Sequence, residues 1–208
     1  MIAIIDYHAG NLTSVRLAFE TIGAPVEVTS DPERIRLADH ILFPGVGAAG
    51  SAMQNLSGLN LAGLLRERVA AGIPFLGICL GTQILFETSE EDGGTPCLGI
   101  LRGSAKRFQP RTHADKIPQI GWNQAKQSRP HPLLSGIPDE SDFYFVHSYY
   151  PAPADPTDVI CTTEYAGTRF ASMVGRNNMA ATQFHPEKSG QIGLKLLANF
   201  VRWDGTVH

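Results

Sequence analysis

The sequence predicts an α/β fold built on a doubly wound, mostly parallel sheet, to which the second half of the chain adds antiparallel strands. In the first half, short apolar segments alternate with segments of helical periodicity, an order typical of parallel β-α-β units. These apolar segments show no regular polar alternation, which indicates strands buried on both faces. In the second half, strand-like segments follow one another with turn residues between them, which favours antiparallel pairing.

Glycine and proline delimit the elements of the first half. A helix over residues 12–22 ends at Gly23, and Asp31 and Pro32 supply the cap and first position of a short second helix. A third helix ends at Gly72, and the third strand ends at the segment Pro44-Gly-Val-Gly47. The expected strands are residues 2–6, 26–29, 41–43 and 74–78, and the later helices are residues 59–71 and 80–87.

Turn chemistry organises the second half. Asn177 and Asn178 are typical of a tight hairpin turn, and Ser189 is expected to cap the last helix. The Pro-rich residues 151–156 indicate a rigid surface loop. No repeat or linker is present, so we expect residues 1–208 to form a single domain. The expected strands are residues 98–108, 117–122, 143–150, 159–163, 170–174 and 179–184, and the last helix is residues 191–203.

Composition narrows the class of protein. The 208 residues are 43% hydrophobic and 18% charged, with a formal net charge of −3, as in an ordinary soluble globule. The sequence has no Lys/Arg cluster of the kind that binds nucleic acid. No apolar run approaches the roughly 20 residues that span a bilayer. Three widely spaced cysteines disfavour a disulfide framework or a zinc site. We expect a cytoplasmic protein with reduced thiols, without metal, cofactor, nucleic-acid partner or membrane contact.

Cys79 stands where an apolar strand is expected to turn sharply into a helix. Gly77 lies two residues before it and Gly81 two residues after it. This is the Gly-x-nucleophile-x-Gly pattern of a nucleophile elbow, with cysteine in place of serine. Such a turn exposes the side chain, and the N-terminus of the following helix favours the thiolate. Free cysteines are more often inert core residues, so the prediction depends on partners elsewhere in the chain.

His185 is the strongest of the seven histidines as a partner for that sulfur. It ends an apolar strand, and Pro186 holds it extended, so that His185 and Glu187 point to the same side. Glu187 can then orient the imidazole while the other ring nitrogen faces the sulfur. His147, beside a strand, is an intermediate candidate. The remaining histidines are expected to be solvated in loops or at termini: His8, His40, His113, His131 and His208.

Backbone donors for an oxyanion are expected at two places. Leu80, directly after Cys79, contributes the N–H that follows the nucleophile in an elbow. The segment Gly45, Val46 and Gly47 ends a neighbouring parallel strand and can bring a second N–H to the same edge of the sheet. Its glycines permit peptide orientations that a Cβ forbids, although the segment alone is equally consistent with a simple strand-ending turn.

Taken together, the runs around Cys79 and Phe184-His-Pro-Glu187 resemble the class I (triad) glutamine amidotransferases, whose sheet is flavodoxin-like and mixed. More narrowly, nearly the whole chain is similar to the glutaminase subunits of histidine biosynthesis. The segments that carry this resemblance are Asp6-Tyr7 with Gly10-Asn11-Leu12, Pro44-Gly-Val-Gly47, Ile120-Gly-Trp122-Asn123, Tyr144-Phe-Val-His-Ser-Tyr149 and Glu187-Lys188-Ser189-Gly190. One departure is His8, where the family usually has glycine.

The resemblance implies an activity and a partner. Cys79 would attack the side-chain amide of glutamine with His185 and Glu187 as acid–base partners, releasing ammonia and glutamate. Gln83 would contact the substrate, and backbone around Ser148 and Tyr149 would bind its α-amino and carboxylate groups. A docked (β/α)₈ cyclase subunit would receive the ammonia through a channel and form imidazole glycerol phosphate and an aminoimidazole ribotide. Its expected docking face includes Asn11, Trp122 and Lys188.

Three other readings stay open at this point. The chain can be the glutaminase of another synthase, such as one serving pyridoxal phosphate or anthranilate synthesis, although the anthranilate type usually carries Pro-Gly-Pro-Gly. It can be a cysteine hydrolase or peptidase that uses the same elbow. It can also be a non-catalytic regulatory module, against which the presence of Cys79, His185 and Glu187 argues.

Overall fold

A computed structural model describes residues 1–8, 11–112 and 115–207 of the chain. Gly10 of the first motif, together with His113 and His208, therefore lies outside the described residues. The exposed His8 is described and adopts a φ of 63°, a conformation that glycine adopts freely. The backbone thus takes a glycine-like turn at the position where this chain departs from the family pattern.

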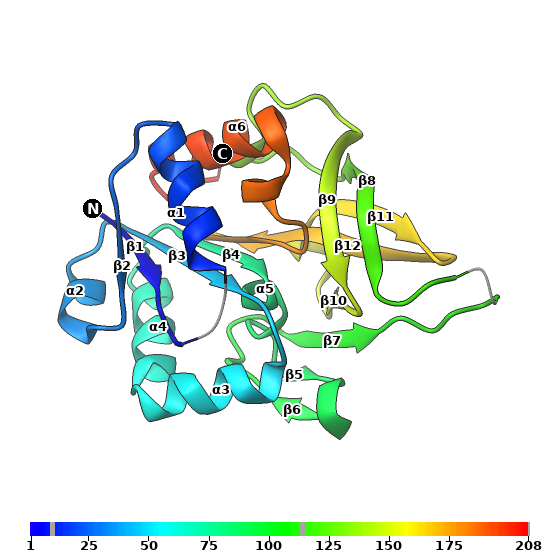
Figure 1. Cartoon of the computed structure of the whole chain (residues 1–208), viewed down its shortest axis with the longest axis horizontal. Helices are drawn as coiled ribbons and strands as arrows, with labels where there is room; N and C mark the ends of the chain where they lie inside the picture. The colour runs from blue at the N-terminus through cyan, green and yellow to red at the C-terminus, as the bar shows by residue number, and fades with distance from the viewer. Residues whose placement is uncertain (9–10, 113–114, 208) are drawn as a thin grey trace.

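A nine-stranded mixed sheet forms the centre of the molecule (Figure 1). Its order is β2-β1-β3-β4-β13-β12-β11-β8-β9; the first five strands run parallel, and each later neighbour pairs antiparallel. The predicted fold class is confirmed. The strands are β1 (Ile2–Ile5), β2 (Val26–Thr29), β3 (His40–Gly45), β4 (Phe75–Cys79), β8 (Gln119–Gln127), β9 (Ser141–His147), β11 (Val159–Tyr165), β12 (Thr168–Arg176) and β13 (Met179–Thr182).

Helices cover both faces of the parallel half. In Figure 1, α1 and α6 lie on one side of the sheet and α3 and α4 on the other. Alternate residues of β1 enter two separate cores, Ile2 and Ile4 one and Ala3 and Ile5 the other, as doubly wound sheets require. The helices are α1 (Leu12–Thr21), α2 (Pro32–Arg36), α3 (Ala49–Gly58), α4 (Leu61–Ala70), α5 (Leu80–Gln83) and α6 (Gly190–Arg202).

A second, four-stranded sheet with the order β10-β7-β5-β6 lies beside α5 and α3 (Figure 1). It breaks the strand expected over residues 143–150: β9 ends at His147, and the chain resumes as β10 after Ser148. The Asn177–Asn178 hairpin turn is confirmed, since Arg176 pairs with Met179 and Asn177 has a φ of 53°. The small sheet contains β5 (Thr88–Ser89), β6 (Thr95–Pro96), β7 (Gly103–Arg107) and β10 (Tyr149–Pro153).

The loop expected over residues 151–156 is partly wrong. Pro151 and Pro153 belong to β10, where Pro151 is buried and pairs with Ala105. β10 is an edge strand, and proline is tolerated at an edge because its missing N–H need not join a ladder. Only the end of the run is helical loop, the short η3 (Pro156–Asp158).

The elbow helix is shorter than residues 80–87 and ends at Gln83. The carbonyls of Ile84, Leu85 and Phe86 instead accept hydrogen bonds from the N–H groups of residues 98–101. This exchange also explains why residues 98–101 form no strand, because their N–H groups are bonded to the turn after α5. The hydrogen bonds between residues 84–86 and 98–101 thus both shorten the expected helix and delay the start of the expected strand.

Helix α3 was not predicted, because no capping residue precedes its small and polar residues. Its N-cap is Ala48, which has no side-chain acceptor. The carboxylate of Glu91, 42 residues further along the chain, accepts from the Ala49 N–H at 2.6 Å. A tertiary contact thus replaces the local cap that sequence patterns rely on.

Two histidines expected to be solvated are not. Nε2 of His40 donates to the Trp203 carbonyl at 2.8 Å, so the side chain ties β3 to the end of α6. His131 is buried: its Nδ1 accepts from the Leu133 N–H at 3.2 Å and its ring packs on Trp203. Burial, reinforced by the charge of Arg129, lowers the pKa of His131 to about 4. In both cases the contact comes from a distant segment.

Replacing His131 with asparagine is expected to flatten the acid side of the stability profile. The folded pKa of His131 lies below its ordinary 6.5, so the unfolded chain binds more protons between about pH 6.5 and 4. The protein therefore loses stability as the pH is lowered through that window. The loss attributable to this ring approaches roughly 3 kcal/mol at the acid end. Asparagine keeps a cap acceptor for Leu133. Urea unfolding at a series of pH values measures the slope, and an equally steep fall in the variant contradicts the prediction.

Candidate active site

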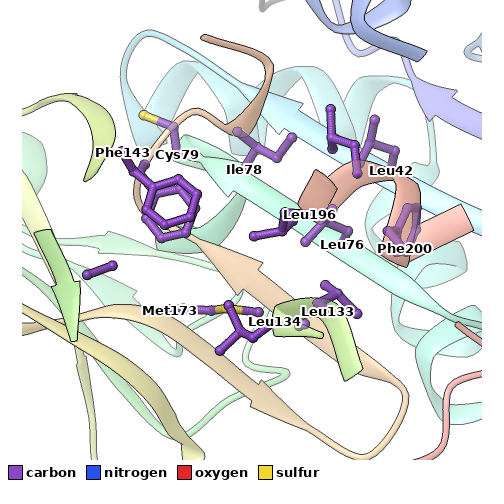
Figure 2. Close-up of a cluster of buried hydrophobic side chains, with 14 of the residues drawn as sticks. Leu42, Leu76, Ile78, Cys79, Leu133, Leu134, Phe143, Met173, Leu196 and Phe200 are labelled. Atoms are coloured by element: carbon purple, nitrogen blue, oxygen red, sulfur yellow. The ribbon is translucent and has the colours of Figure 1, made fainter. Parts of the chain in front are cut away.

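Cys79 occupies a strained turn at the carboxyl end of β4. Its φ of 55° and ψ of −108° are unusual for a residue with a Cβ, and such strain is concentrated at functional sites. Figure 2 shows the sulfur at the edge of a buried cluster, pointing away from Leu76 and Leu196. The expected elbow geometry is therefore present, with α5 starting at Leu80.

The two flanking glycines allow this turn. A Cβ on Gly81 would collide with the Phe43 carbonyl oxygen of β3, so only glycine fits. A Cβ on Gly77 would lie 3.0 Å from the Ala181 Cβ and 3.1 Å from the Gly81 carbonyl oxygen. Close approach of strand and helix, which the Gly-x-Cys-x-Gly spacing predicts, is confirmed.

His185 and Glu187 meet as the extended Pro186 segment requires. His185 has a φ of −99° and a ψ of 95° and precedes the short helix η4 (Pro186–Lys188). Its Nδ1 lies 2.7 Å from the Glu187 Oε1, and both side chains are almost completely buried. Because a carboxylate only accepts, Nδ1 carries the proton and Nε2 is left for another partner. Nε2 is buried, and the Cys79 sulfur is the group beside it.

The charge balance of the site favours a protonated His185. Burial works against the imidazolium, but the Cys79 sulfur and the Glu187 carboxylate outweigh burial and raise the pKa of His185 to about 10. A cation beside the sulfur stabilises the thiolate. The arrangement can therefore hold a nucleophilic sulfur together with a proton ready for a leaving group.

The backbone expected to bind an oxyanion runs directly beside the elbow. Gly45 pairs with Cys79 in the parallel ladder between β3 and β4. A Cβ on Gly45 would meet the Tyr7 hydroxyl and would lie 2.9 Å from the Gly81 N, so this strand can approach only as glycine. Gly47 has a φ of 97°. The Val46 peptide is thus flanked by two residues that permit its rotation.

A cavity of about 390 Å³ opens over these groups. It is lined by most of the expected catalytic and substrate-binding residues. Four more lining residues were not assigned to substrate from the sequence: Glu91, Val146, His147 and Lys188, the last of which was expected at the docking face. A second cavity, of about 560 Å³, lies over β8 and β11 and contains Trp122 but no member of the triad. The full lining of the first cavity is Val46, Gly47, Cys79, Leu80, Gln83, Glu91, Val146, His147, Ser148, Tyr149, His185 and Lys188.

The Tyr149 carbonyl organises one wall of this cavity. It accepts from His147 Nδ1 at 2.7 Å and from Gln83 Nε2 at 2.9 Å. Both lone pairs of the carbonyl are thereby used, so recognition of a ligand by this backbone has to come from its N–H groups. Burial lowers the pKa of His147 to about 4, so this ring is neutral, with its proton on Nδ1.

A buried amide was missed in the sequence analysis. Gln183 is fully buried, and its Nε2 lies 3.6 Å from the Cys79 sulfur. The signal was available, because in an extended segment Gln183 and His185 lie two residues apart and share a side. No such signal exists for Glu91, which only the tertiary fold brings to the cavity.

The three expected docking residues lie in different settings. Trp122 is exposed on β8 and packs edge-on against the Tyr144 ring. The ammonium nitrogen of Lys188 lies over the same ring, 5.9 Å from its centroid. Asn11 caps α1 by accepting from the Ser14 N–H. The alternative role of a helix cap is thus present for Asn11, and its docking role stays a prediction.

Metal-binding clusters and membrane-spanning helices are both absent from residues 1–8, 11–112 and 115–207. Within these ranges, no group of three or more His, Cys, Asp or Glu side chains is placed to hold a metal ion. Within the same ranges, no helix has the length and apolar character needed to cross a membrane.

Comparison with known proteins gives the chain its relatives. Residues 3–203 match the family model for glutamine amidotransferase class-I. The imidazole glycerol phosphate synthase subunit HisH of Nitrosococcus oceani is 52% identical over 206 residues, covering 98% of both chains. The subunit of the same name from Methylococcus capsulatus is 53% identical, covering 98% of this chain and 96% of that one.

Solved structures agree on the fold. A crystal structure of a glutamine amidotransferase superposes with a TM-score of 0.75 at 15% identity, covering 99% of this chain and all of the other. A PurLQS structure from Thermotoga maritima gives a TM-score of 0.74, also at 15% identity, and 97% of each chain is covered. The chain belongs to the class-I glutamine amidotransferases and, within them, to the family of the imidazole glycerol phosphate synthase subunit HisH.

Proposed function

We propose that this chain is the glutaminase subunit of an imidazole glycerol phosphate synthase, acting in cytoplasmic histidine biosynthesis. The observation that carries the proposal is the position of the His185 ring, held by Glu187 beside the Cys79 sulfur, with both Cys79 and His185 on the wall of a ligand-sized cavity. Full-length similarity to subunits of that synthase supports the choice among glutaminases.

The first half of the reaction makes a thioester. The Cys79 thiolate attacks the amide carbon of glutamine, and the C=O electrons move to oxygen. Backbone N–H groups of Leu80 and of the Gly45–Gly47 segment hold this oxyanion. The C–N bond then breaks, and the His185 imidazolium gives its proton to the departing nitrogen, which leaves as ammonia.

The second half regenerates the enzyme. Neutral His185 takes a proton from water, and the resulting hydroxide attacks the γ-glutamyl thioester. Collapse of that intermediate releases glutamate and returns the sulfur as thiolate beside the imidazolium. Glu187 keeps the ring in one orientation through both halves, because its bond to Nδ1 persists in either charge state.

The cavity suggests how glutamine is oriented. Both N–H bonds of the Gln83 amide are directed at protein acceptors, Tyr149 O and Gln183 Oε1, which leaves its carbonyl oxygen to accept from the substrate. Glu91 supplies a carboxylate on the cavity wall, the group that would pair with the α-ammonium. Backbone N–H groups near Ser148 and Tyr149 would bind the α-carboxylate.

The partner that receives the ammonia is proposed to be a (β/α)₈ cyclase subunit. Ammonia is protonated in bulk water, so it must pass to the second active site without escaping. A surface suited to docking runs from Lys188 at the cavity, over Tyr144, to the exposed Trp122 and Ile120 on β8. Exposed aromatic residues of this kind are typical anchors of protein interfaces.

A nitrogen tracer tests the function. The chain, assembled with its cyclase subunit, is given glutamine carrying ¹⁵N in the side-chain amide together with unlabelled ammonium. We expect glutamate to be released and the label to enter the imidazole product in preference to the unlabelled ammonium. Release of glutamate with an unlabelled product contradicts channelling, and the absence of glutamate release contradicts the proposed function itself.

A further inference from the structure

Among the residues that the structure describes, Gln183 is the one fully buried amide that reaches the Cys79 sulfur, and no step of the reaction above uses it. It lies just beyond the end of β13, with its N–H bonded to the Ser172 carbonyl of the neighbouring strand at 2.9 Å. It does not line the cavity, so substrate recognition does not explain a polar side chain here. A buried amide of this kind is costly to leave without partners.

The orientation of this amide follows from its neighbours. The Tyr149 carbonyl can only accept, so the Gln83 amide must turn its NH₂ group toward it. The same NH₂ group lies 3.0 Å from Gln183, which must therefore present its oxygen. Gln183 is left with its own NH₂ group on the side of the sulfur, at 3.6 Å. A chain of three contacts thus directs an N–H at Cys79.

We propose, on the basis of the function proposed above, that Gln183 is a catalytic residue that stabilises the Cys79 thiolate by donating a hydrogen bond to it. Gln83 and Tyr149 are positioning residues that keep the Gln183 amide in the donating orientation. The sulfur then has two favourable neighbours, the His185 imidazolium and the Gln183 N–H. A donor of this kind acts when the sulfur carries its charge, before it attacks the amide carbon and again when the thioester intermediate collapses and the thiolate leaves.

In the other two cysteines burial outweighs the groups that favour a thiolate, the Ser89 N–H at Cys97 and the charge of Arg129 near Cys161. Burial raises the pKa of Cys97 to about 11 and that of Cys161 to about 12. Cys97 has its sulfur 3.4 Å from the Thr95 carbonyl, an acceptor that favours the protonated thiol. Cys79 is also buried, but it faces an amide donor and an imidazolium. The Cys79 sulfur also has a carbonyl neighbour, Val146 O at 3.9 Å, so what distinguishes it from Cys97 is the side-chain amide and the imidazole beside it.

Alkylation of the full chain by iodoacetamide, with the labelled cysteine identified by peptide mapping, measures the sulfur directly. Gln183→Met has a similar length and no donor, and we expect it to slow labelling of Cys79 by about 10- to 100-fold, the range of a hydrogen bond to a charged group. Gln183→Glu, which places a carboxylate at the sulfur, should slow labelling further. In the assembled synthase, kcat for glutamine should fall with little change in KM, because Gln183 does not contact the cavity.

Ser172→Ala is the matched control. Ser172 is buried beside Gln183, and its hydroxyl has no hydrogen-bond partner within the described ranges, so labelling should keep the wild-type rate. An unchanged rate in Gln183→Met, or an equal loss in Ser172→Ala, overturns the proposal. If Gln183→Met does not fold, the variant Gln83→Met tests the proposal instead. This variant keeps Gln183 but removes the Gln83 amide that orients the Gln183 side chain. We expect it to slow labelling several-fold, and a wild-type rate overturns the proposal.

The proposed function and this inference can fail separately. Labelling of Cys79 needs no glutamine, so it reports on Gln183 even if glutamine is not the substrate. If the wild-type complex hydrolyses glutamine while Gln183→Met labels normally, the role of Gln183 is wrong and the function stands. If labelling depends on Gln183 while glutamine is not hydrolysed, the function is wrong and the thiolate donor stands.

Discussion

Replacing Cys79 with alanine is expected to lower glutamine hydrolysis by about 10⁴- to 10⁶-fold, the scale on which enzymes lose rate when their nucleophile is removed. The thioester cannot form without the sulfur, and the remaining backbone donors have no intermediate to stabilise. Synthesis of the imidazole product from added ammonium should continue, because the cyclase active site is on the other subunit. Release of glutamate and turnover with ammonium, measured on the same preparation, check both halves of this result.

Cys97→Ala and Cys161→Ala are the matched controls for Cys79→Ala. Both cysteines are buried free thiols, as Cys79 is, but burial keeps the pKa of each far above neutrality. Each variant is expected to retain glutamine hydrolysis within a few-fold of wild type. If Cys79→Ala also loses the ammonium-dependent reaction, Cys79 is a structural residue and the proposed nucleophile is wrong.

The isolated chain is expected to hydrolyse glutamine about 10²- to 10³-fold more slowly than the chain docked to its cyclase subunit. That range is the cost of one missing oxyanion donor. The peptide of Val46 lies between Gly45 and Gly47, the residue lines the cavity, and 38% of it is exposed. A partner that covers Val46 can therefore fix the orientation of the peptide that faces the substrate.

Titration of the chain with its partner measures this activation. Trp122→Ala should require at least about fivefold more partner to reach half of the full rate, because truncating a central aromatic anchor typically costs more than about 1 kcal/mol of binding. At saturating partner the variant should regain the wild-type rate, since Trp122 lines no part of the active-site cavity. Full turnover by the isolated wild-type chain contradicts the activation.

The parallel half of the fold was predictable because its signals are local. Apolar strands without polar alternation and helices ended by Gly23 and Gly72 can be recognised from a few neighbouring residues. Helix α3 and the early end of α5 were not predictable. Glu91 caps the first from 42 residues away, and residues 98–101 take the carbonyls that would have continued the second.

In the candidate site, too, features set by neighbouring residues were predictable and features set by distant segments were not. The short-range spacings around Cys79 and between His185 and Glu187 predicted two geometries that the structure contains, a strained elbow and an imidazole–carboxylate contact of 2.7 Å. Residues whose partners come from distant segments were misjudged. His131 was expected in solvent and is buried against Trp203, and Gln183 was passed over although it contacts the sulfur.

What the sequence determined by itself is the chemistry available: a thiol at a glycine-flanked turn, an extended His-Pro-Glu segment, and a glycine-rich strand end. Each is encoded within a few residues, because sterics and backbone preference act between neighbours along the chain. What only the tertiary structure decided is the environment of that thiol. The Gln83–Gln183 contact, the charge on His185 and the difference between Cys79 and the inert Cys97 and Cys161 depend on burial and on groups from separate strands. Desolvation and hydrogen-bond direction are properties of the packed molecule, and they exist only once those strands meet.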